Sequence, residues 1–288
     1  MKKILFTGGT GFLGRNLIPL LECKYEVTSP TRTELNLLDE ESVAKYLEMR
    51  KFDIVIHAAI PNPVYNKNDS YNSLCEDSLR AFLNLYKNNS NYEKMIYFGS
   101  GAEFDKTNEI SLIEENEFGK HIPKDGYGIS KYIMNELCRN SENIYNLRIF
   151  GCYGKTDADF KFLTHIIRCC LQNKEITMNQ DCLFDYIIVN DLAAVIDEII
   201  NSIPKYHDYN VCSGNRYKLS EIALLIMKEL NINSDLKILK PGLNREYTGS
   251  NKRLLNEFPN ISFTSLIDGI KMQIRYEKES MENEKKSC

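Results

Sequence analysis

A glycine-rich turn directly after the first apolar run constrains the fold of this 288-residue chain more than any other feature. The apolar run covers residues 4–7, and Gly8, Gly11 and Gly14 follow it with G-x-x-G-x-x-G spacing. Residues 12–21 then have the pattern of a helix. Glycines at this spacing permit a tight turn, a close approach of the backbone to a pyrophosphate, and close packing of helix on strand. Because the helix N-terminus adds unpaired N–H groups, the sequence predicts a nucleotide-binding turn.

Short apolar runs alternate with longer amphipathic segments through the first half of the chain, which is the pattern of β-α-β units. We expect further strands at residues 25–29, 54–57, 95–99 and 144–150, and helices at 40–49, 72–88 and 127–139. The alternation then loosens, with helices expected at 162–171, 191–203 and 221–230 and strands at 176–178 and 186–189. The pattern predicts an α/β fold, a doubly wound parallel sheet with a smaller C-terminal lobe interleaved with it.

Composition restricts the class of protein without naming a function. Lys and Arg number 36 and Asp and Glu 40, so the formal net charge of −4 argues against a broad surface for nucleic acid or an anionic membrane. No apolar stretch approaches the roughly 20 residues of a membrane-spanning helix, and the N-terminal apolar run is too short for a signal peptide. The nine cysteines form no CxxC pair. We therefore expect reduced thiols, no metal site and a cytoplasmic location.

A second group of residues indicates acid–base chemistry. Tyr127 and Lys131 stand four residues apart, on one face of an expected helix, and Ser100 follows an expected strand. A neighbouring ammonium favours the phenolate, so we expect Lys131 to lower the pKa of Tyr127 toward neutrality. Ser100 would supply a hydroxyl to a reacting carbonyl oxygen. A tyrosine and a lysine at this spacing are common in proteins. When they follow a glycine turn and a serine at the end of a strand, the pattern indicates that Ser100, Tyr127 and Lys131 are catalytic.

With these motifs in this order, the chain resembles the extended short-chain dehydrogenases/reductases, a family of nucleotide-sugar epimerases, dehydratases and ketoreductases. Residues 7–14 match its T-G-x-x-G-F-x-G turn and 57–59 its H-x-A strand end, while 147–154 resemble L-R-x-x-N-V-Y-G and 184–191 resemble R-D-F-V-x-V-D-D. The resemblance implies a Rossmann-type sheet, a nicotinamide cofactor, a nucleotide-sugar substrate and a homodimer formed through the helices at 72–88 and 127–139. In the family the tyrosine is the acid/base and the lysine orients the nicotinamide ribose.

The expected cofactor is NADP(H), with NAD(H) as the weaker choice. The stretch after the second strand has no acidic residue before Glu34 and carries Arg32, which suits a 2′-phosphate. Residues 34–39 read E-L-N-L-L-D, similar to the GDP-L-fucose synthases of this family, in which a nearby arginine meets that phosphate. The resemblance assigns cofactor contacts to Thr7, Gly8, Thr10, Gly11, Phe12, Leu13, Arg32, Leu38, Asp39, Ala58, Ala59, Tyr127, Lys131 and Phe150.

The comparison with the family also argues against dehydration, and against epimerisation of the fucose synthase kind, as the reaction of this chain. Fucose synthases use a cysteine for epimerisation where this chain has Ala102, and the 4,6-dehydratases follow the catalytic threonine with Asp-Glu where this chain has Gly101 and Ala102. Neither residue can carry a proton, so hydride transfer to or from a carbonyl is the chemistry that remains. The expected substrate contacts are Ser100, Gly101, Ala102, Lys161, Arg216 and Arg245.

We therefore expect an NADPH-dependent reductase of the C4 keto group of a nucleotide-linked 4-keto-6-deoxyhexose, for deoxysugar and surface polysaccharide biosynthesis, similar to GDP-L-fucose synthases and CDP-abequose synthases. Two alternatives stay open: a C4 epimerase with tightly held NAD, and a non-catalytic NADP-binding regulatory protein. Residues 1–155 and 184–205 are assigned to the NADP-binding Rossmann domain, and 156–183 and 206–276 to the nucleotide-sugar lobe. Residues 277–288, almost all charged or small, are expected to be disordered.

Overall fold

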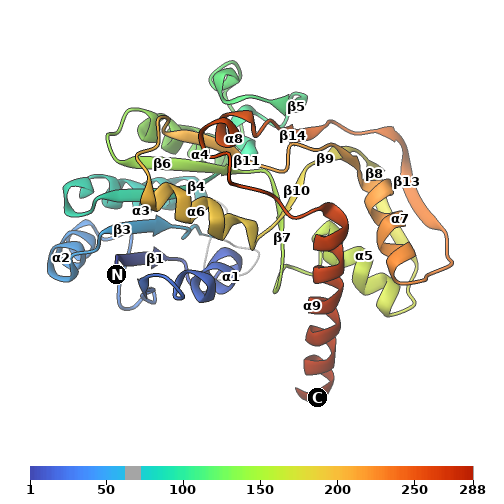
Figure 1. Cartoon of the computed structure of the whole chain (residues 1–288). Helices are drawn as coiled ribbons and strands as arrows, with labels where there is room; N and C mark the ends of the chain where they lie inside the picture. Colours follow the sequence, from blue (N-terminus) through green and yellow to red (C-terminus); the bar gives the residue numbers. More distant parts are fainter. Residues whose placement is uncertain (62–72, 288) are drawn as a thin grey trace.

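Six strands form the central sheet of the computed structural model, which describes residues 1–61 and 73–287 (Figure 1). Across the sheet they are β2 (Glu26–Thr28), β1 (Lys3–Thr7), β3 (Ile54–His57), β4 (Lys94–Ser100), β6 (Ile144–Ile149) and β11 (Asp208–Val211). Every neighbouring pair is parallel. The strands β2 and β3 lie on opposite sides of β1, and ligands of open α/β sheets bind where the winding reverses in this way. The predicted Rossmann-type sheet is confirmed.

Helices cover both faces of the sheet, because its strands carry apolar side chains on both sides. In β1, Ile4 and Phe6 pack into one core and Leu5 into the other. The first face is covered by α1 (Phe12–Leu21), α6 (Asp191–Asn201) and α8 (Lys252–Glu257). The second is covered by α2 (Glu40–Arg50), α3 (Leu74–Tyr86) and α4 (Gly126–Arg139). The expected start of α3 at residue 72 lies outside the described residues.

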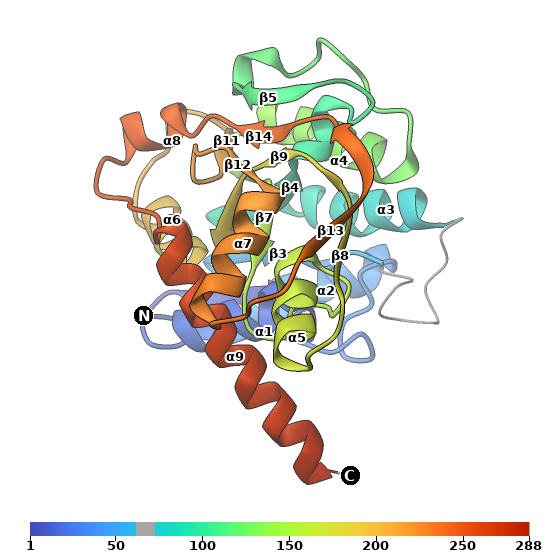
Figure 2. The same ribbon diagram turned by 90° about the vertical axis from the view of Figure 1, so that its right-hand side faces the viewer.

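A separate apolar core forms the second lobe, which consists of α5 (Phe162–Leu171), α7 (Leu219–Glu229), α9 (Leu266–Ser287) and the parallel strands β8 (Ile176–Asp181) and β13 (Leu236–Leu243). Figure 2 shows these three helices together in front of the central sheet. The short parallel pair β7 (Gly151–Tyr153) and β10 (Tyr186–Ile188) connects the lobe to the sheet. Within the described ranges, no helix has the length and apolarity needed to cross a membrane.

A four-stranded sheet lies beside the carboxyl end of β4 and brings together segments that are far apart in the sequence. Its order is β12 (Tyr217–Lys218), β9 (Leu183–Phe184), β14 (Tyr247–Gly249) and β5 (Ile110–Ile113). Three short 3-10 helices complete the elements: η1 (Asn89–Asn91), η2 (Gly101–Phe104) and η3 (Glu115–Glu117). Because β14 also contacts η2, a late segment of the chain reaches the residues that follow Ser100.

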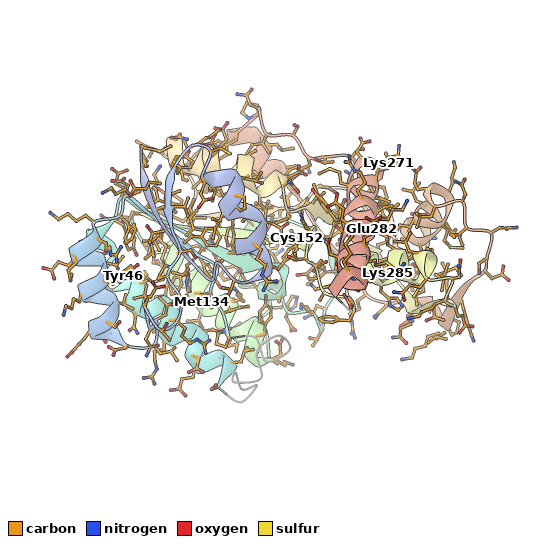
Figure 3. All side chains as sticks on the ribbon, turned by 90° about the horizontal axis from the view of Figure 1, so that it is seen from below. Tyr46, Met134, Cys152, Lys271, Glu282 and Lys285 are labelled. Carbon is orange, nitrogen blue, oxygen red and sulfur yellow. The ribbon has the colours of Figure 1, made fainter. Side chains whose placement is uncertain are left out.

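The segment 277–287 was expected to be disordered, and in the structure it is the C-terminal half of α9. Glu277 is buried and accepts a hydrogen bond from Arg168 Nε of α5 at 2.7 Å, while Arg168 also reaches Glu284 at 3.1 Å. Two acidic residues of this segment therefore have a partner on α5, which composition alone does not show. Figure 3 marks three further charged side chains along α9: Lys271, Glu282 and Lys285.

Candidate functional site

The glycine turn lies where β1 ends and α1 begins, beside the end of β3. Gly8 has a φ of +80°, and a Cβ there would lie 2.7 Å from the backbone nitrogen of Ala59. A Cβ on Gly14 would lie 2.4 Å from the Cα of Gly9. Glycine is thus required at both positions, because the turn approaches β3 and the helix approaches the turn more closely than a side chain permits.

The N-terminus of α1 can accept an anion. Its N-cap is Gly11, no side chain caps its N–H groups, and its first turn carries no acidic residue. The unpaired N–H groups and the helix dipole favour a pyrophosphate at this point. Eight of the predicted cofactor residues lie in or beside this turn: Thr7, Gly8, Thr10, Gly11, Phe12, Leu13, Ala58 and Ala59. These residues fit a dinucleotide cofactor.

Three more predicted cofactor residues lie between β2 and α2. Arg32 is in an exposed turn. The carboxylate of Glu34 stabilises this turn, because it accepts hydrogen bonds from the N–H of Thr31 at 2.7 Å and from the hydroxyl of Thr31 at 2.8 Å. These bonds lower the pKa of Glu34. Leu38 is exposed, and Asp39 caps α2. The acidic side chain nearest to Arg32 in sequence is therefore bound to its own turn.

Ser100 is the last residue of β4 and the N-cap of η2. Its Oγ accepts a hydrogen bond from the Ala102 N–H at 3.2 Å, and its own N–H donates to the Glu103 carboxylate at 3.0 Å. These two bonds form a capping box, which fixes the orientation of the serine. Gly101 and Ala102 are buried in the same turn. The Ser-x-x-Glu spacing is visible in the sequence and would have identified Glu103.

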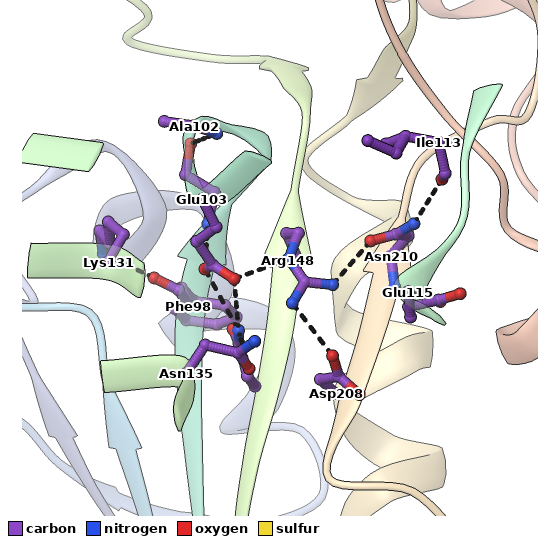
Figure 4. Close-up of polar contacts among 12 residues, drawn as sticks. Phe98, Ala102, Glu103, Ile113, Glu115, Lys131, Asn135, Arg148, Asp208 and Asn210 are labelled. Atoms are coloured by element: carbon purple, nitrogen blue, oxygen red, sulfur yellow. Dashed lines mark hydrogen bonds and ion pairs between the residues drawn. The ribbon is translucent and has the colours of Figure 1, made fainter. Parts of the chain in front are cut away.

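A network of buried charged and polar side chains includes Glu103 of η2 and Arg148 of β6 (Figure 4). Glu103 and Arg148 are both fully buried and joined by a 2.7 Å contact between Oε2 and Nε. Arg148 also donates to Asn210 at 2.8 Å and to Asp208 at 3.1 Å, both on β11. Burial raises the pKa of Glu103, and the Arg148 cation acts in the opposite direction. The network joins η2, β6 and β11.

Tyr127 and Lys131 lie one turn apart near the start of α4. The Nζ of Lys131 donates to the Phe98 carbonyl at 2.7 Å and lies 5.8 Å from the ring centre of Tyr127. Burial lowers the pKa of Lys131 to about 8. Burial also raises the pKa of Tyr127, although a hydrogen bond with Ser100 acts against this rise. The expectation that Lys131 lowers the pKa of Tyr127 is therefore not met, because desolvation of the phenol dominates.

Two residues that the sequence analysis missed lie beside this group. The Oη of Tyr247 is 3.5 Å from Ser100 Oγ. The Nζ of Lys106 lies 5.6 Å from the ring centre of Tyr127 and 5.7 Å from that of Tyr247. No local motif marks either residue, because the fold brings them to the site from the segments before β5 and within β14.

The remaining predicted residues are more dispersed. Phe150 is buried against the rings of Phe104 and Tyr247, at 6.5 and 5.3 Å between ring centres. Lys161, the exposed N-cap of α5, is close enough to Lys106 to contribute to the lowering of its pKa.

Two arginines predicted to bind substrate lie near β14. Arg216 donates to Glu246 at 2.6 Å, and Arg245 is exposed in the connection from β13 to β14. Among residues 1–61 and 73–287, no group of three or more His, Cys, Asp and Glu side chains could hold a metal ion.

Comparisons with known proteins agree with this arrangement. Residues 4–212 match the NAD dependent epimerase/dehydratase family. GDP-6-deoxy-D-talose 4-dehydrogenase of Aggregatibacter actinomycetemcomitans is 29% identical over 284 residues, which cover 92% of this chain and 94% of that protein. GDP-L-colitose synthase of Yersinia pseudotuberculosis is 26% identical over 302 residues, covering 95% of this chain and 97% of that protein.

Solved structures share the fold at lower identity. GDP-mannoheptose C4 reductase from Campylobacter jejuni, solved with NADP bound, has a TM-score of 0.81 at 20% identity and covers 96% of this chain and 98% of its own. The Bordetella bronchiseptica enzyme WbmG, solved with NAD and UDP, has a TM-score of 0.83 at 15% identity and covers 97% and 96%. The chain belongs to the NAD-dependent epimerase/dehydratase family of extended short-chain dehydrogenases/reductases, and it is an NAD(P)-dependent oxidoreductase.

Proposed function

We propose that this enzyme is an NADPH-dependent 4-ketoreductase of a GDP-linked 4-keto-6-deoxyhexose. The observation that carries the proposal is the convergence of Ser100, Tyr127 and Lys131, with Gly101 and Ala102 supplying no ionisable side chain beside the serine. That set suffices for hydride transfer at a carbonyl and provides no acid or base there for dehydration. The names of two similar proteins, a GDP-6-deoxy-D-talose 4-dehydrogenase and a GDP-L-colitose synthase, support a GDP-sugar.

The proposed roles follow from the contacts of each side chain. A reduced nicotinamide cofactor whose pyrophosphate is bound at the glycine turn would supply the hydride to C4, and the ketone would become an alcohol as Tyr127 gives its proton to the C4 oxygen. Ser100 donates a hydrogen bond to the same oxygen. Lys131, buried beside the phenol, stabilises the negative charge that remains on Tyr127 after the proton has left.

We further propose NADP(H) over NAD(H), because Arg32 lies after β2 and the carboxylate of Glu34 is bound to Thr31. Lys161 and Arg245 are the proposed cations for the substrate diphosphate, whereas Arg216 is already paired with Glu246. The proposal includes the division given above into two segments that bind the cofactor and two that bind the substrate. It also includes a homodimer formed through α3 and α4, a cytoplasmic location, and a role in deoxysugar biosynthesis.

NADPH oxidation with GDP-4-keto-6-deoxyhexoses tests the function. We expect one NADPH consumed per ketone reduced, and turnover of Tyr127→Phe lower by roughly two or more orders of magnitude, because general acid catalysis is lost. The affinity for NADPH should change little. Tyr206→Phe, an exposed tyrosine before β11 at the opposite end of the sheet, is the matched control.

Other results would assign the chain differently. Interconversion of C4 epimers with retained NAD and no net NADPH consumption would indicate the epimerase. Binding of NADPH without turnover across GDP-, dTDP-, CDP- and UDP-linked ketosugars would indicate the regulatory protein.

A further inference from the structure

The space next to Ser100 that a side chain at position 101 would occupy is filled by a residue from β14. A Cβ on Gly101 would lie 2.6 Å from the Oη of Tyr247 and 2.8 Å from its Cζ. Gly101 does not have a left-handed φ. The backbone at this position could therefore carry an alanine. The side-chain space could not, because the alanine Cβ would meet the ring of Tyr247 and would lie 2.8 Å from the ring of Phe150.

The ring of Tyr247 is held firmly in this place. It packs against Phe150 and Phe184, with ring centres 5.3 and 5.2 Å away. Its backbone pairs with Ile110 of β5 on one side and with Phe184 of β9 on the other. Because strands and rings fix the aromatic part, the hydroxyl is presented to Ser100 with little freedom to move.

The hydrogen-bonding capacity of Ser100 gives this contact a consequence. A serine hydroxyl has one proton to donate and two lone pairs that accept. The N–H of Ala102 uses one lone pair, at 3.2 Å. The Tyr247 hydroxyl lies 3.5 Å from the same Oγ, where either hydroxyl can donate, and as the donor Tyr247 would use the second lone pair. The single proton of Ser100 is then not used by Tyr247, and it can be directed at Tyr127 or at the reacting carbonyl oxygen.

We propose that Tyr247 is a positioning residue for catalysis, which donates a hydrogen bond to Ser100 Oγ and thereby directs the Ser100 proton to the substrate. The absence of a side chain at Gly101 admits the phenol. The inference rests on the proposed role of Ser100 in hydride transfer. It does not depend on whether the enzyme is a reductase or a C4 epimerase, because both reactions transfer a hydride at the same oxygen-bearing carbon.

The test is Tyr247→Phe, which keeps the ring packing and removes the hydroxyl. We expect the rate of hydride transfer to or from the nicotinamide to fall roughly 10- to 100-fold, with the substrate KM and the NADPH affinity within about twofold of the wild type. Gly101→Ala, whose Cβ would meet both Tyr247 and Phe150, should lower the rate of hydride transfer at least as much. Tyr206→Phe should behave as the wild type.

A double-mutant cycle distinguishes positioning from a merely structural role. In a Ser100→Ala background, Tyr247→Phe should cause no further loss, because the tyrosine acts through the serine. An unchanged rate in Tyr247→Phe would overturn the inference, as would a full additional loss in the Ser100→Ala background. Tyr127→Phe separates the two proposals: if it is fully active, the proposed acid–base mechanism fails, whereas an inactive Tyr127→Phe with a normal Tyr247→Phe rejects only the positioning role.

Discussion

At the scale of single residues, the buried ammonium of Lys131 opposes folding. Burial lowers its pKa from 10.5 to about 8. Between these two pH values Lys131 is protonated in the unfolded chain and neutral in the folded chain. The free energy of unfolding therefore rises with pH in this range, by about 3 kcal/mol in all. Lys131→Met removes that dependence. We expect the unfolding free energy of the wild type to rise relative to that of Lys131→Met between about pH 8 and about pH 10.5.

Urea unfolding of both proteins at several pH values measures this difference directly, because the other titrating groups are common to the two chains. Parallel stability curves would show that Lys131 keeps its ordinary pKa. Lys131→Met should also lose turnover. This result would indicate that Lys131 is kept for catalysis although its burial lowers the stability of the fold.

The residues of the candidate site differ in how far the sequence could predict them. Tyr127 and Lys131 are four residues apart on one helix and Ser100 ends a strand, so local spacing sufficed to group them. Tyr247 reaches the same place only through the pairing of β14 with β5 and β9, which no short-range pattern encodes, and Lys106, shortly after η2, stands in no motif. The pKa of Tyr127 also depends on burial created by distant segments, and for that reason its direction was predicted wrongly.

At the scale of elements, the Glu103–Arg148 pair joins η2, which follows β4, to β6. Arg148→Met would leave the fully buried Glu103 carboxylate without its cation, and breaking such a pair costs about 3–5 kcal/mol. We expect this loss in urea unfolding near neutral pH. The exposed pair of Arg80 and Glu76 provides the control, because Arg80→Met should change stability by less than about 1 kcal/mol.

The destabilisation by Arg148→Met should also shrink in acid. Without the cation, the pKa of folded Glu103 rises further above its unfolded value, and a group of this kind adds stability as the pH falls through its folded pKa. A loss that stays constant from neutral to acidic pH would mean that Glu103 finds another partner.

Most strands of the central sheet and most of the longer helices were predicted closely, but the edge strand β11 and the short strands outside the central sheet were not. The bounds of β3 and α1 were predicted correctly, because continuous apolar runs and helical periodicity are local signals. The short strands β5, β12 and β14 have few residues and are defined by pairing with distant segments. The helix α9 was not predicted, and its C-terminal half was expected to be disordered, because the ion pairs of Glu277 and Glu284 with Arg168 of α5 depend on the tertiary fold.

At the scale of the whole molecule, α9 closes the second lobe against α5, and Arg168 lies at the centre of that contact. Its side chain is 16% exposed and reaches Glu277, Glu284 and Asp159, of which Glu277 is 4% exposed. Arg168→Ala leaves the Glu277 carboxylate buried without a cation. We therefore expect the second lobe to loosen while the six-stranded sheet and the glycine turn keep their structure, because the ion-pair partners given above for Arg168 lie on α9 and just before α5.

If the second lobe binds the nucleotide sugar, as proposed, Arg168→Ala should weaken sugar binding roughly tenfold or more and leave the NADPH affinity within about twofold. Titration calorimetry with each ligand measures the two affinities separately. Lys271→Ala, on an exposed lysine of α9 that lies 3.9 Å from Glu229, should change neither. Equal losses for both ligands would contradict the division into a cofactor domain and a sugar lobe, because they would show that the loosened helix disturbs the sheet as well.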